Sequence, residues 1–386
     1  MKIFLTGATG FLGGELLVQL SKRKDISKIY CLVRGFDITD ASARLERVFN
    51  LHNDHFDRAK IIPVTGNLYD EDLTEQLVAN KELRQVDTII HSAANTSFSR
   101  IYNDVVEQVN VEGLRKLLLW ARQLPKLSTF LYIGTATICG KDIKAREIFE
   151  HESPNIHVNH LVRYTYTKMK GELMLHDYLP EEKILVARPS IIMGDSRNVI
   201  PRSPVILWAL ATVNALRLCT FNANAQLDII PVDYCSEAII KLLFCKRNHQ
   251  VYHISAGIQS ATTPALIFKV IDQHFQEAPT FKFVHRSLLD QMKKWSKGAL
   301  HFNNELFQYP GYLDYWERFF QDKKNLRIIL AGLEPYVGFI ELEQLFSNKK
   351  LLTDTGLEAP VPAHEYIKNS VEYIRKINIL EGALES

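Results

Sequence analysis

The sequence has few cysteines, no excess charge of either sign and no long hydrophobic run. Its 5 cysteines are scattered and form no CxxC pair, which indicates reduced, mostly buried thiols. Lys and Arg number 46 against 44 Asp and Glu, so the net charge of +2 creates no field that would recruit nucleic acid or an anionic membrane. Hydrophobic residues make up 46% and charged residues 23% of the 386 positions, which excludes a disordered, collagen-like or coiled-coil chain.

The sequence also shows no targeting signal and no comfortable membrane span. The first apolar run is interrupted by Gly7 and Gly10, and no charged start is followed by a long apolar stretch and a cleavage site. The most apolar later stretch, residues 203–221, contains Asn214 and Arg217 and is too polar to cross a bilayer. We therefore expect a cytoplasmic protein without a transmembrane segment.

The first half of the sequence alternates short apolar runs with amphipathic stretches. The runs are nearly continuous, which is typical of strands buried on both faces of a parallel sheet; they are residues 2–6, 29–33, 61–65, 88–91, 129–133 and 184–187. The stretches between them have helical spacing; they are residues 12–21, 40–50, 70–78, 105–122 and 164–178. This alternation predicts an α/β fold, a doubly wound parallel-sheet Rossmann domain.

The rhythm changes after residue 193. Residues 197–225 have an apolar, mostly helical pattern, whereas a strand at 227–231, a helix at 233–245 and a strand at 251–255 return to the sheet pattern. From residue 256 onward the chain is richer in Trp, Tyr and Phe. We therefore predict a cofactor-binding sheet domain of residues 1–193 and 227–256. Residues 194–226 and 257–386 are predicted to form a smaller, mostly helical substrate lobe.

A glycine-rich loop directly follows the first strand. Glycines here allow a tight turn, close approach of the backbone to a pyrophosphate and close packing of helix on strand, and the helix N-terminus favours an anion. The flanking strand and helix are the context that such a motif requires, although a glycine-rich turn without a ligand remains an alternative. The residues predicted to contact a dinucleotide here are Gly7, Thr9, Gly10, Phe11, Leu12 and Gly13.

Arg34 ends the second strand, where a carboxylate would bind the ribose of NAD. No Asp or Glu stands at or beside this strand end, and a guanidinium there suits a 2′-phosphate, so the sequence favours NADP(H). The alternative for Arg34 is a solvated arginine at a strand end. Asn67 follows the third strand, where its amide could reach the adenine.

Tyr164 and Lys168 lie four positions apart and so share one face of a helix. A lysine ammonium beside a phenol stabilises the phenolate and lowers the pKa of the phenol toward neutrality. The phenol can then protonate a carbonyl oxygen as hydride arrives, or deprotonate an alcohol in the reverse direction. The alternative is an ordinary surface helix pair. Tyr166, the competing phenol, faces another side and is expected to serve packing.

Three further polar residues are candidates around this pair. Thr135 follows the fifth strand and is expected to hydrogen-bond the substrate oxygen, with Thr137 in reserve. Asn110 interrupts an apolar helix and is expected to hold a water near Lys168. His91 follows a strand but has no metal-ligand spacing, so we predict no metal site.

Together these residues resemble the extended short-chain dehydrogenase/reductase superfamily. The glycine loop matches its TGxxGxxG motif, residues 91–94 its strand-four motif, Asn110 its helix asparagine, and Thr135, Tyr164 and Lys168 its catalytic triad. Within the superfamily, the chain resembles the thioester reductase and fatty acyl-CoA reductase branch, whose domains are called male-sterility type. That resemblance covers roughly residues 1–255. It rests on residues 31–34 with Arg44-Leu45, and on residues 111–114, 187–195 and 230–234.

The resemblance implies further cofactor contacts and a reaction. The additional cofactor-binding positions are Arg44, Leu68, Ala93, Ala94, Pro189 and Ile191, beside Tyr164 and Lys168 themselves. Two residues depart from the family pattern: Arg163 replaces the usual glycine before the catalytic tyrosine, and Asn67 replaces the usual aspartate. The expected activity is NADPH-dependent reduction of an acyl thioester, on coenzyme A or a carrier protein, to an aldehyde or alcohol. The apolar run 205–218 would line an acyl channel or form ordinary lobe core.

Other functions of the same fold remain open. A nucleotide-sugar dehydratase is expected to carry an acid where Ala136 follows Thr135, and an NAD-retaining epimerase would more naturally show a carboxylate at position 34. A ketone or sterol-type alcohol dehydrogenase would use the same triad. An NADP-sensing regulator would need no catalytic triad, so the presence of the triad favours an enzyme. A homodimer is compatible with this fold.

Overall fold

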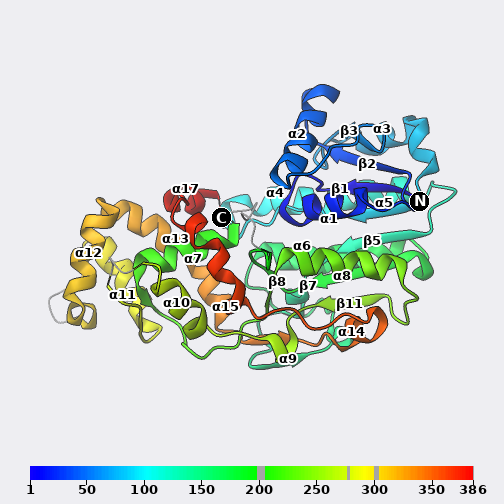
Figure 1. The fold of residues 1–386 in the computed structure, drawn as a ribbon. Helices are drawn as coiled ribbons and strands as arrows, with labels where there is room; N and C mark the ends of the chain where they lie inside the picture. The colour runs from blue at the N-terminus through cyan, green and yellow to red at the C-terminus, as the bar shows by residue number, and fades with distance from the viewer. Residues whose placement is uncertain (198–204, 276–278, 300–303, 386) are drawn as a thin grey trace.

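The computed structural model describes residues 1–197, 205–275, 279–299 and 304–385. Its centre is a seven-stranded, wholly parallel sheet in the spatial order β11-β7-β5-β4-β1-β2-β3. This confirms the predicted doubly wound α/β fold (Figure 1). The strands are β1 (Lys2–Thr6), β2 (Lys28–Val33), β3 (Ile61–Thr65), β4 (Thr88–His91), β5 (Thr129–Ile133), β7 (Ile184–Pro189) and β11 (Val251–Ile254).

Both faces of the sheet are covered by helices, which explains the continuous apolar runs. On β1, Ile3 and Leu5 face one core and Phe4 faces the other, where its ring lies 4.6 Å from that of Trp120. The first face carries α1 (Phe11–Ser21), α2 (Ile38–Leu51) and α8 (Val232–Phe244). The second carries α3 (Leu73–Ala79), α5 (Gly113–Ala121) and α6 (Arg163–Tyr178).

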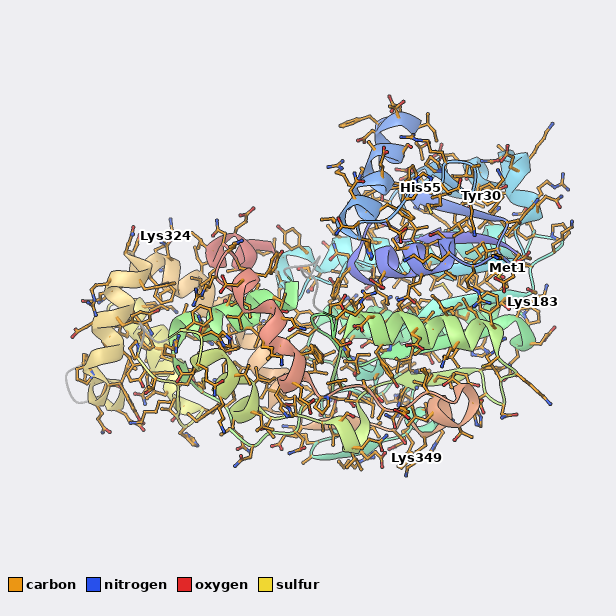
Figure 2. All side chains as sticks on the ribbon, in the orientation of Figure 1. Met1, Tyr30, His55, Lys183, Lys324 and Lys349 are labelled. Atoms are coloured by element: carbon orange, nitrogen blue, oxygen red, sulfur yellow. The ribbon has the colours of Figure 1, made fainter. Side chains whose placement is uncertain are left out.

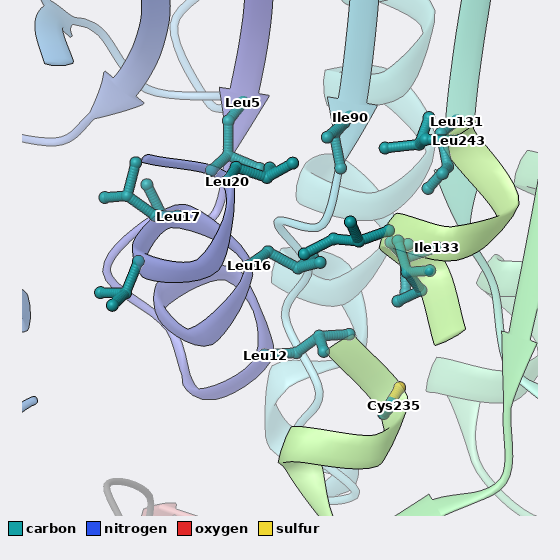
Figure 3. Packing of buried hydrophobic residues seen from close by; sticks show 14 of the residues in the cluster. Leu5, Leu12, Leu16, Leu17, Leu20, Ile90, Leu131, Ile133, Cys235 and Leu243 are labelled. Atoms are coloured by element: carbon teal, nitrogen blue, oxygen red, sulfur yellow. The ribbon is translucent and has the colours of Figure 1, made fainter. Parts of the chain in front are cut away.

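Figure 3 shows the first of these cores at close range. Leu12, Leu16 and Leu20 project from α1 toward strand residues such as Ile90, and all four are at most 9% exposed. They recur every four positions along α1, as a helix buried on one face requires. Because α1 begins directly after the glycine loop, this packing fixes the loop on the sheet.

A second, mostly helical lobe lies beside the sheet domain, on the left in Figure 1. Its core includes the buried residues Trp208, Trp295 and Trp316. Its helices are α7 (Val205–Leu216), α10 (Pro264–Asp272), α11 (Ser287–Ser296), α12 (Pro310–Phe320), α13 (Lys323–Ile340), α15 (Ala363–Tyr366), α16 (Val371–Ile374) and α17 (Ile379–Glu385). Residues 198–204 of the predicted apolar helical region lie outside the described residues.

Residues 344–355 return to the sheet domain, whereas the sequence analysis assigned them to the lobe. Strand β13 (Gln344–Phe346) pairs with β6 (Arg146–Ile148), and Leu351 on α14 (Lys349–Thr355) belongs to the core of the sheet. In Figure 2, Lys349 accordingly lies below the sheet, far from Lys324 on the lobe. The remaining short elements are β8 (Ile191–Ile192), β9 (Leu218–Cys219), β10 (Ile229–Ile230), α9 (Gly257–Ser260) and β12 (Lys282–Phe283).

The stretch predicted as one helix over residues 105–122 is interrupted. It consists of α4 (Asn103–Glu107), one turn of π-helix at Gln108–Glu112, and α5. Such π-turns are frequent at functional sites. Among the described residues, no helix combines the length and the apolar character needed to cross a bilayer.

Candidate active site

The predicted site residues follow the carboxyl ends of the parallel strands, which all meet at one edge of the sheet. In the sheet, β4 and β1 lie between β5 and β2. The site residues that follow β5 and β7 are therefore separated from those that follow β2 and β3. A dinucleotide along this edge would therefore have its adenine beside β2 and β3 and its nicotinamide toward β5 and β7. The residues are Pro189 and Ile191 at the end of β7, Thr135 after β5, Ala93 and Ala94 after β4, Gly7 to Gly13 after β1, Arg34 after β2, and Asn67 and Leu68 after β3.

The glycine loop has no room for side chains. Gly7 adopts a φ of +77°, and a Cβ atom there would lie 2.7 Å from the backbone nitrogen of Ala93. A Cβ atom on Gly13 would lie 2.0 Å from the carbonyl oxygen of Gly7, which also accepts a hydrogen bond from the Gly10 N–H at 2.9 Å. A side chain at either position would therefore collide with backbone.

The N-terminus of α1 is suited to an anion. Gly10 is its N-cap, no side chain caps it within the described residues, and its first turn carries no acid. The free N–H groups and the helix dipole there favour a pyrophosphate. Thr9 is exposed and Phe11 half-buried beside this turn, whereas the Leu12 side chain packs into the core. These residues fit a dinucleotide, with Leu12 able to contribute only its backbone.

Two arginines lie together at the end of β2. Arg34 is exposed, and the half-buried guanidinium of Arg44 on α2 donates a hydrogen bond to the Arg34 carbonyl oxygen. The nearby acids serve the local backbone: the Asp37 carboxylate accepts from the Asp40 N–H at 2.8 Å, and that of Asp40 from the Phe36 N–H at 3.3 Å. The strand end thus presents two guanidinium groups.

The loop after β3 is held by a lysine that the sequence analysis missed. The buried ammonium of Lys116 on α5 donates to the carbonyl oxygens of Leu68, Tyr69 and Asp70, at 3.4, 3.3 and 2.7 Å. The Asn67 amide oxygen accepts from the Tyr69 N–H at 3.2 Å, so this side chain stabilises its own loop. The sequence feature that could have revealed this contact is the lysine inside the apolar stretch 114–120.

Lys168 is almost completely buried under the sheet edge. Its side chain donates to the carbonyl oxygen of Ile133 at 2.7 Å, and its nitrogen lies 5.0 Å from the centre of the Tyr132 ring. Burial lowers the pKa of Lys168 to about 7. Burial also raises the pKa of Tyr164, whereas the sequence analysis expected it to be lowered, so the phenol is protonated.

Two threonine hydroxyls lie together where the sequence analysis expected that of Thr135. Thr135 and Thr137 share a hydrogen bond of 2.9 Å between their hydroxyl oxygens, and Thr135 also donates to the carbonyl oxygen of Pro189 at 3.4 Å. The short 3-10 turn that contains Thr137 packs against α6, which carries Tyr164. Either threonine could therefore orient a substrate oxygen.

Asn110 is held in place by three hydrogen bonds to protein groups. From the π-turn its amide nitrogen donates to the Asn95 carbonyl oxygen at 2.9 Å and the Thr167 hydroxyl at 3.0 Å, and its oxygen accepts from the Asn95 N–H at 2.8 Å. Thr167 in turn donates to the Tyr164 carbonyl oxygen at 2.8 Å. Asn110 therefore joins the loop after β4 to the helix that carries Tyr164.

His91 has a structural role. Its Nδ1 shares a hydrogen bond of 2.8 Å with the Thr6 hydroxyl, and its ring stacks at 5.9 Å on that of Tyr132. Burial lowers the pKa of His91 to about 3, so the ring is neutral. In the part of the chain that the structure describes, no group of three or more His, Cys, Asp or Glu side chains could hold a metal ion.

Curated relatives of the chain are reductases. It is 37% identical over 312 residues to fatty acyl-CoA reductase 2, chloroplastic, of Arabidopsis thaliana, with 62% of this chain and 50% of that protein covered. It is 29% identical over 300 residues to fatty acyl-CoA reductase 2 of Mus musculus, with 66% and 58% covered. The chain thus spans about half to three-fifths of the length of these two relatives.

Solved structures share the fold along nearly the whole chain. The terminal R domain of the myxalamid PKS-NRPS pathway superimposes with a TM-score of 0.72 at 21% identity, covering 96% of this chain and 89% of that one. UDP-glucuronic acid 4-epimerase from Bacillus cereus, in complex with NAD, gives 0.64 at 17% identity, covering 97% and 99%.

The sheet domain identifies the family to which the chain belongs. The family model described as "Male sterility protein" matches residues 5–239, which include the glycine loop, the paired threonines and the Tyr164–Lys168 turn. The chain therefore belongs to the male sterility protein family, in the thioester reductase and fatty acyl-CoA reductase branch of the extended short-chain dehydrogenases/reductases.

Proposed function

We propose that this chain is a nicotinamide-dependent oxidoreductase that reduces an acyl thioester. The observation that carries the proposal is the position of a protonated phenol and a buried lysine on α6 at the sheet edge where the glycine loop would hold the dinucleotide. The similarity to fatty acyl-CoA reductases supports an acyl thioester as the substrate class.

The chemistry assigns a role to each polar group. When bound, the reduced nicotinamide supplies a hydride for the carbonyl carbon. Tyr164 and Thr135 would hydrogen-bond the carbonyl oxygen, where negative charge develops as the carbon becomes tetrahedral. The carbon–sulfur bond then breaks, the thiol leaves with a proton and an aldehyde remains. Lys168 would hold its positive charge near Tyr164 and stabilise the phenolate after proton transfer.

The expected proton donor can be tested by replacing Tyr164 with Phe. NADPH oxidation would be measured against a panel of acyl-CoA thioesters of increasing length, with products identified by mass spectrometry. Tyr164→Phe should lower turnover about 10²- to 10⁴-fold while the Kd for NADPH barely changes, because the ring remains and only the acidic proton is lost.

Tyr166→Phe is the matched control, since Tyr166 lies on the same helix with its ring under the Arg163 guanidinium, 4.6 Å from the ring centre. Turnover retained by Tyr164→Phe, or lost equally in both variants, would contradict the assignment. Aldehyde or alcohol formed by the wild-type protein would establish the reaction class.

We also propose that the cofactor is NADP(H), on the strength of the two guanidinium groups at the end of β2. Arg34→Asp should weaken NADPH binding about tenfold or more and NADH binding far less, because it replaces a phosphate partner by a repelling charge. Fluorescence titration with both cofactors measures this. Arg47→Asp, the same change at an exposed position of α2, is the control. Equal losses for both cofactors would exclude Arg34 as a phosphate ligand.

Three wider expectations accompany the proposal. Carrier-protein-bound thioesters are a second substrate form, because a thiolation-reductase di-domain of an archaeal non-ribosomal peptide synthetase shares the fold with a TM-score of 0.68 at 21% identity, covering 97% of this chain and 90% of that one. A cytoplasmic location rests on the 5 free cysteines. A homodimer rests on the fold alone.

A further inference from the structure

An aromatic side chain of the sheet domain lies beside the catalytic phenol. Phe98, in the loop after β4, has its ring centre 6.2 Å from that of Tyr164. The same ring lies 4.9 Å from Tyr336 and 5.3 Å from Phe339, both on α13 of the helical lobe. All four side chains are half-buried. We call Phe98, Tyr336 and Phe339 the aromatic wall; it joins the two parts of the molecule where the reacting carbon would lie.

Tyr336 is held in place by tightly packed residues of the lobe. The buried Trp208 of α7 packs edge-on against Tyr336 with ring centres 5.5 Å apart, and its indole N–H donates to the Ile379 carbonyl oxygen at 2.6 Å. Gly382 of α17 lies so close that a Cβ atom there would be 2.1 Å from Trp208 Cδ1. Figure 1 shows α17 lying over α13 and α7. Trp208 and α17 are therefore in direct contact behind Tyr336.

The run 205–218, one candidate for an acyl channel, is instead part of the lobe core where it is described. Leu207, Trp208, Ala211 and Leu216 are each at most 2% exposed, and they pack with residues of α10 to α13. These side chains have no free face to offer a substrate. Apolar surface close to Tyr164 is supplied by the loop after β4 and by α13.

We propose that the aromatic wall binds the acyl chain of the substrate directly beyond the carbonyl and determines which chains are accepted. This inference rests on the proposed function. With the carbonyl oxygen at Tyr164, the carbons next to it would lie close to Phe98, whose ring pairs with that of the phenol at 6.2 Å. The transfer of methylene groups from water to such a surface is favourable, whereas the charged groups of coenzyme A are not stabilised there. The aromatic wall therefore favours an extended aliphatic chain over a short acyl group.

Binding of unreactive thioethers tests this surface without relying on turnover. S-dodecyl coenzyme A and S-ethyl coenzyme A would be titrated calorimetrically into the cofactor-loaded protein. We expect the wild-type protein to bind the dodecyl thioether much more tightly, and Phe98→Ala and Tyr336→Leu to reduce the ratio of the two Kd values about tenfold or more. Phe98→Gln removes the apolar ring but fills much of its volume, and it serves where the alanine variant fails to fold.

Phe319→Leu is the matched control, because Phe319 lies on α12 of the same lobe, is 47% exposed, and its ring pairs with those of Tyr315 and Phe320. It should leave the ratio unchanged. An unchanged ratio in the folded Phe98 and Tyr336 variants, or no preference for the dodecyl thioether in the wild-type protein, would overturn the proposal. Turnover separates the two hypotheses: if no acyl-CoA is reduced but the variants still reduce the ratio, the proposed reaction fails and the acyl surface stands.

Discussion

At the scale of single residues, burial determines the chemistry of the candidate site. The spacing of Tyr164 and Lys168 was readable in the sequence, but their pKa shifts were not, because these arise from the depth of α6 against β5. The same is true of Asn110, whose partners depend on a π-turn that no residue pattern announced. Hydrophobic periodicity locates a helix, whereas one extra residue in a turn changes which side chains meet.

The buried lysine makes a testable contribution to stability. The pKa of Lys168 is about 7 in the folded chain and 10.5 ordinarily, so between these values the unfolded chain binds a proton that the folded one does not. The free energy of unfolding should therefore rise with pH across this range, by up to about 1.4 kcal/mol per pH unit from this group.

Urea denaturation at pH 7, 8 and 9 without cofactor would measure the effect against Lys168→Met, which cannot titrate. The stability of the wild-type protein relative to this variant should increase with pH. A difference that is constant or decreases with pH would contradict the assigned pKa.

At the scale of elements, the cofactor edge is organised by helices that reach the loops between strands. For example, Lys116 on α5 donates hydrogen bonds to three consecutive carbonyl groups of the loop after β3. The sequence indicated the strand, the loop and the helix, yet the contact depends on how α5 is placed against β3. Contacts between elements that are distant in sequence could not be derived from local patterns.

Removing this lysine should affect the adenine end of the site. Lys116→Met keeps the length of the side chain but leaves the three carbonyl groups without their donor, so the loop should lose its shape. We expect the Kd for NADPH to rise about fivefold or more, with turnover at saturation little changed. Arg115→Met, a neighbour whose side chain pairs with Glu112 on the surface, is the control. A fall in turnover with unchanged NADPH affinity would refute this role.

At the scale of the whole molecule, the alternation of runs predicted the sheet and most of its helices, because every central strand is buried on both faces. The pattern could not show that residues 344–355 return to the sheet domain, since a strand of three residues and a helix of seven carry little periodicity. The candidate catalytic residues were proposed from motifs and their position relative to strands, whereas the aromatic wall combines residues more than 230 positions apart.

Asp228 connects three distant parts of the chain. Its buried carboxylate follows Leu227 near β10 and accepts hydrogen bonds from the N–H groups of Ala256 at 2.7 Å and Phe346 at 2.9 Å. Asp228→Ala would leave both donors buried without this acceptor and should lower the free energy of unfolding by about 2 kcal/mol or more. Asp290→Ala, at an exposed position of α11, is the control in the same urea titration.

The pH dependence of this loss has a definite sign. Burial raises the pKa of Asp228 from 3.8 to about 6, so between these values the folded chain binds a proton that the unfolded one lacks. The contribution of the group to stability therefore falls as pH rises from 4 to 6. Asp228→Ala should cost more at pH 5 than at pH 7, and the opposite order would contradict the assigned pKa.

The pairing of β13 with β6 has a consequence for the order of folding. The Gln344 amide donates to the carbonyl oxygens of Gly140 and Ile143, each at 2.7 Å, across some 200 positions of sequence. A ribosome would therefore release the glycine loop, the catalytic helix and most of the lobe before the last segment of the sheet domain exists. Because such non-local contacts form slowly, the nascent chain would wait with this side of the domain uncovered. The segments that carry the candidate site are thus synthesised before the segment that completes the sheet domain.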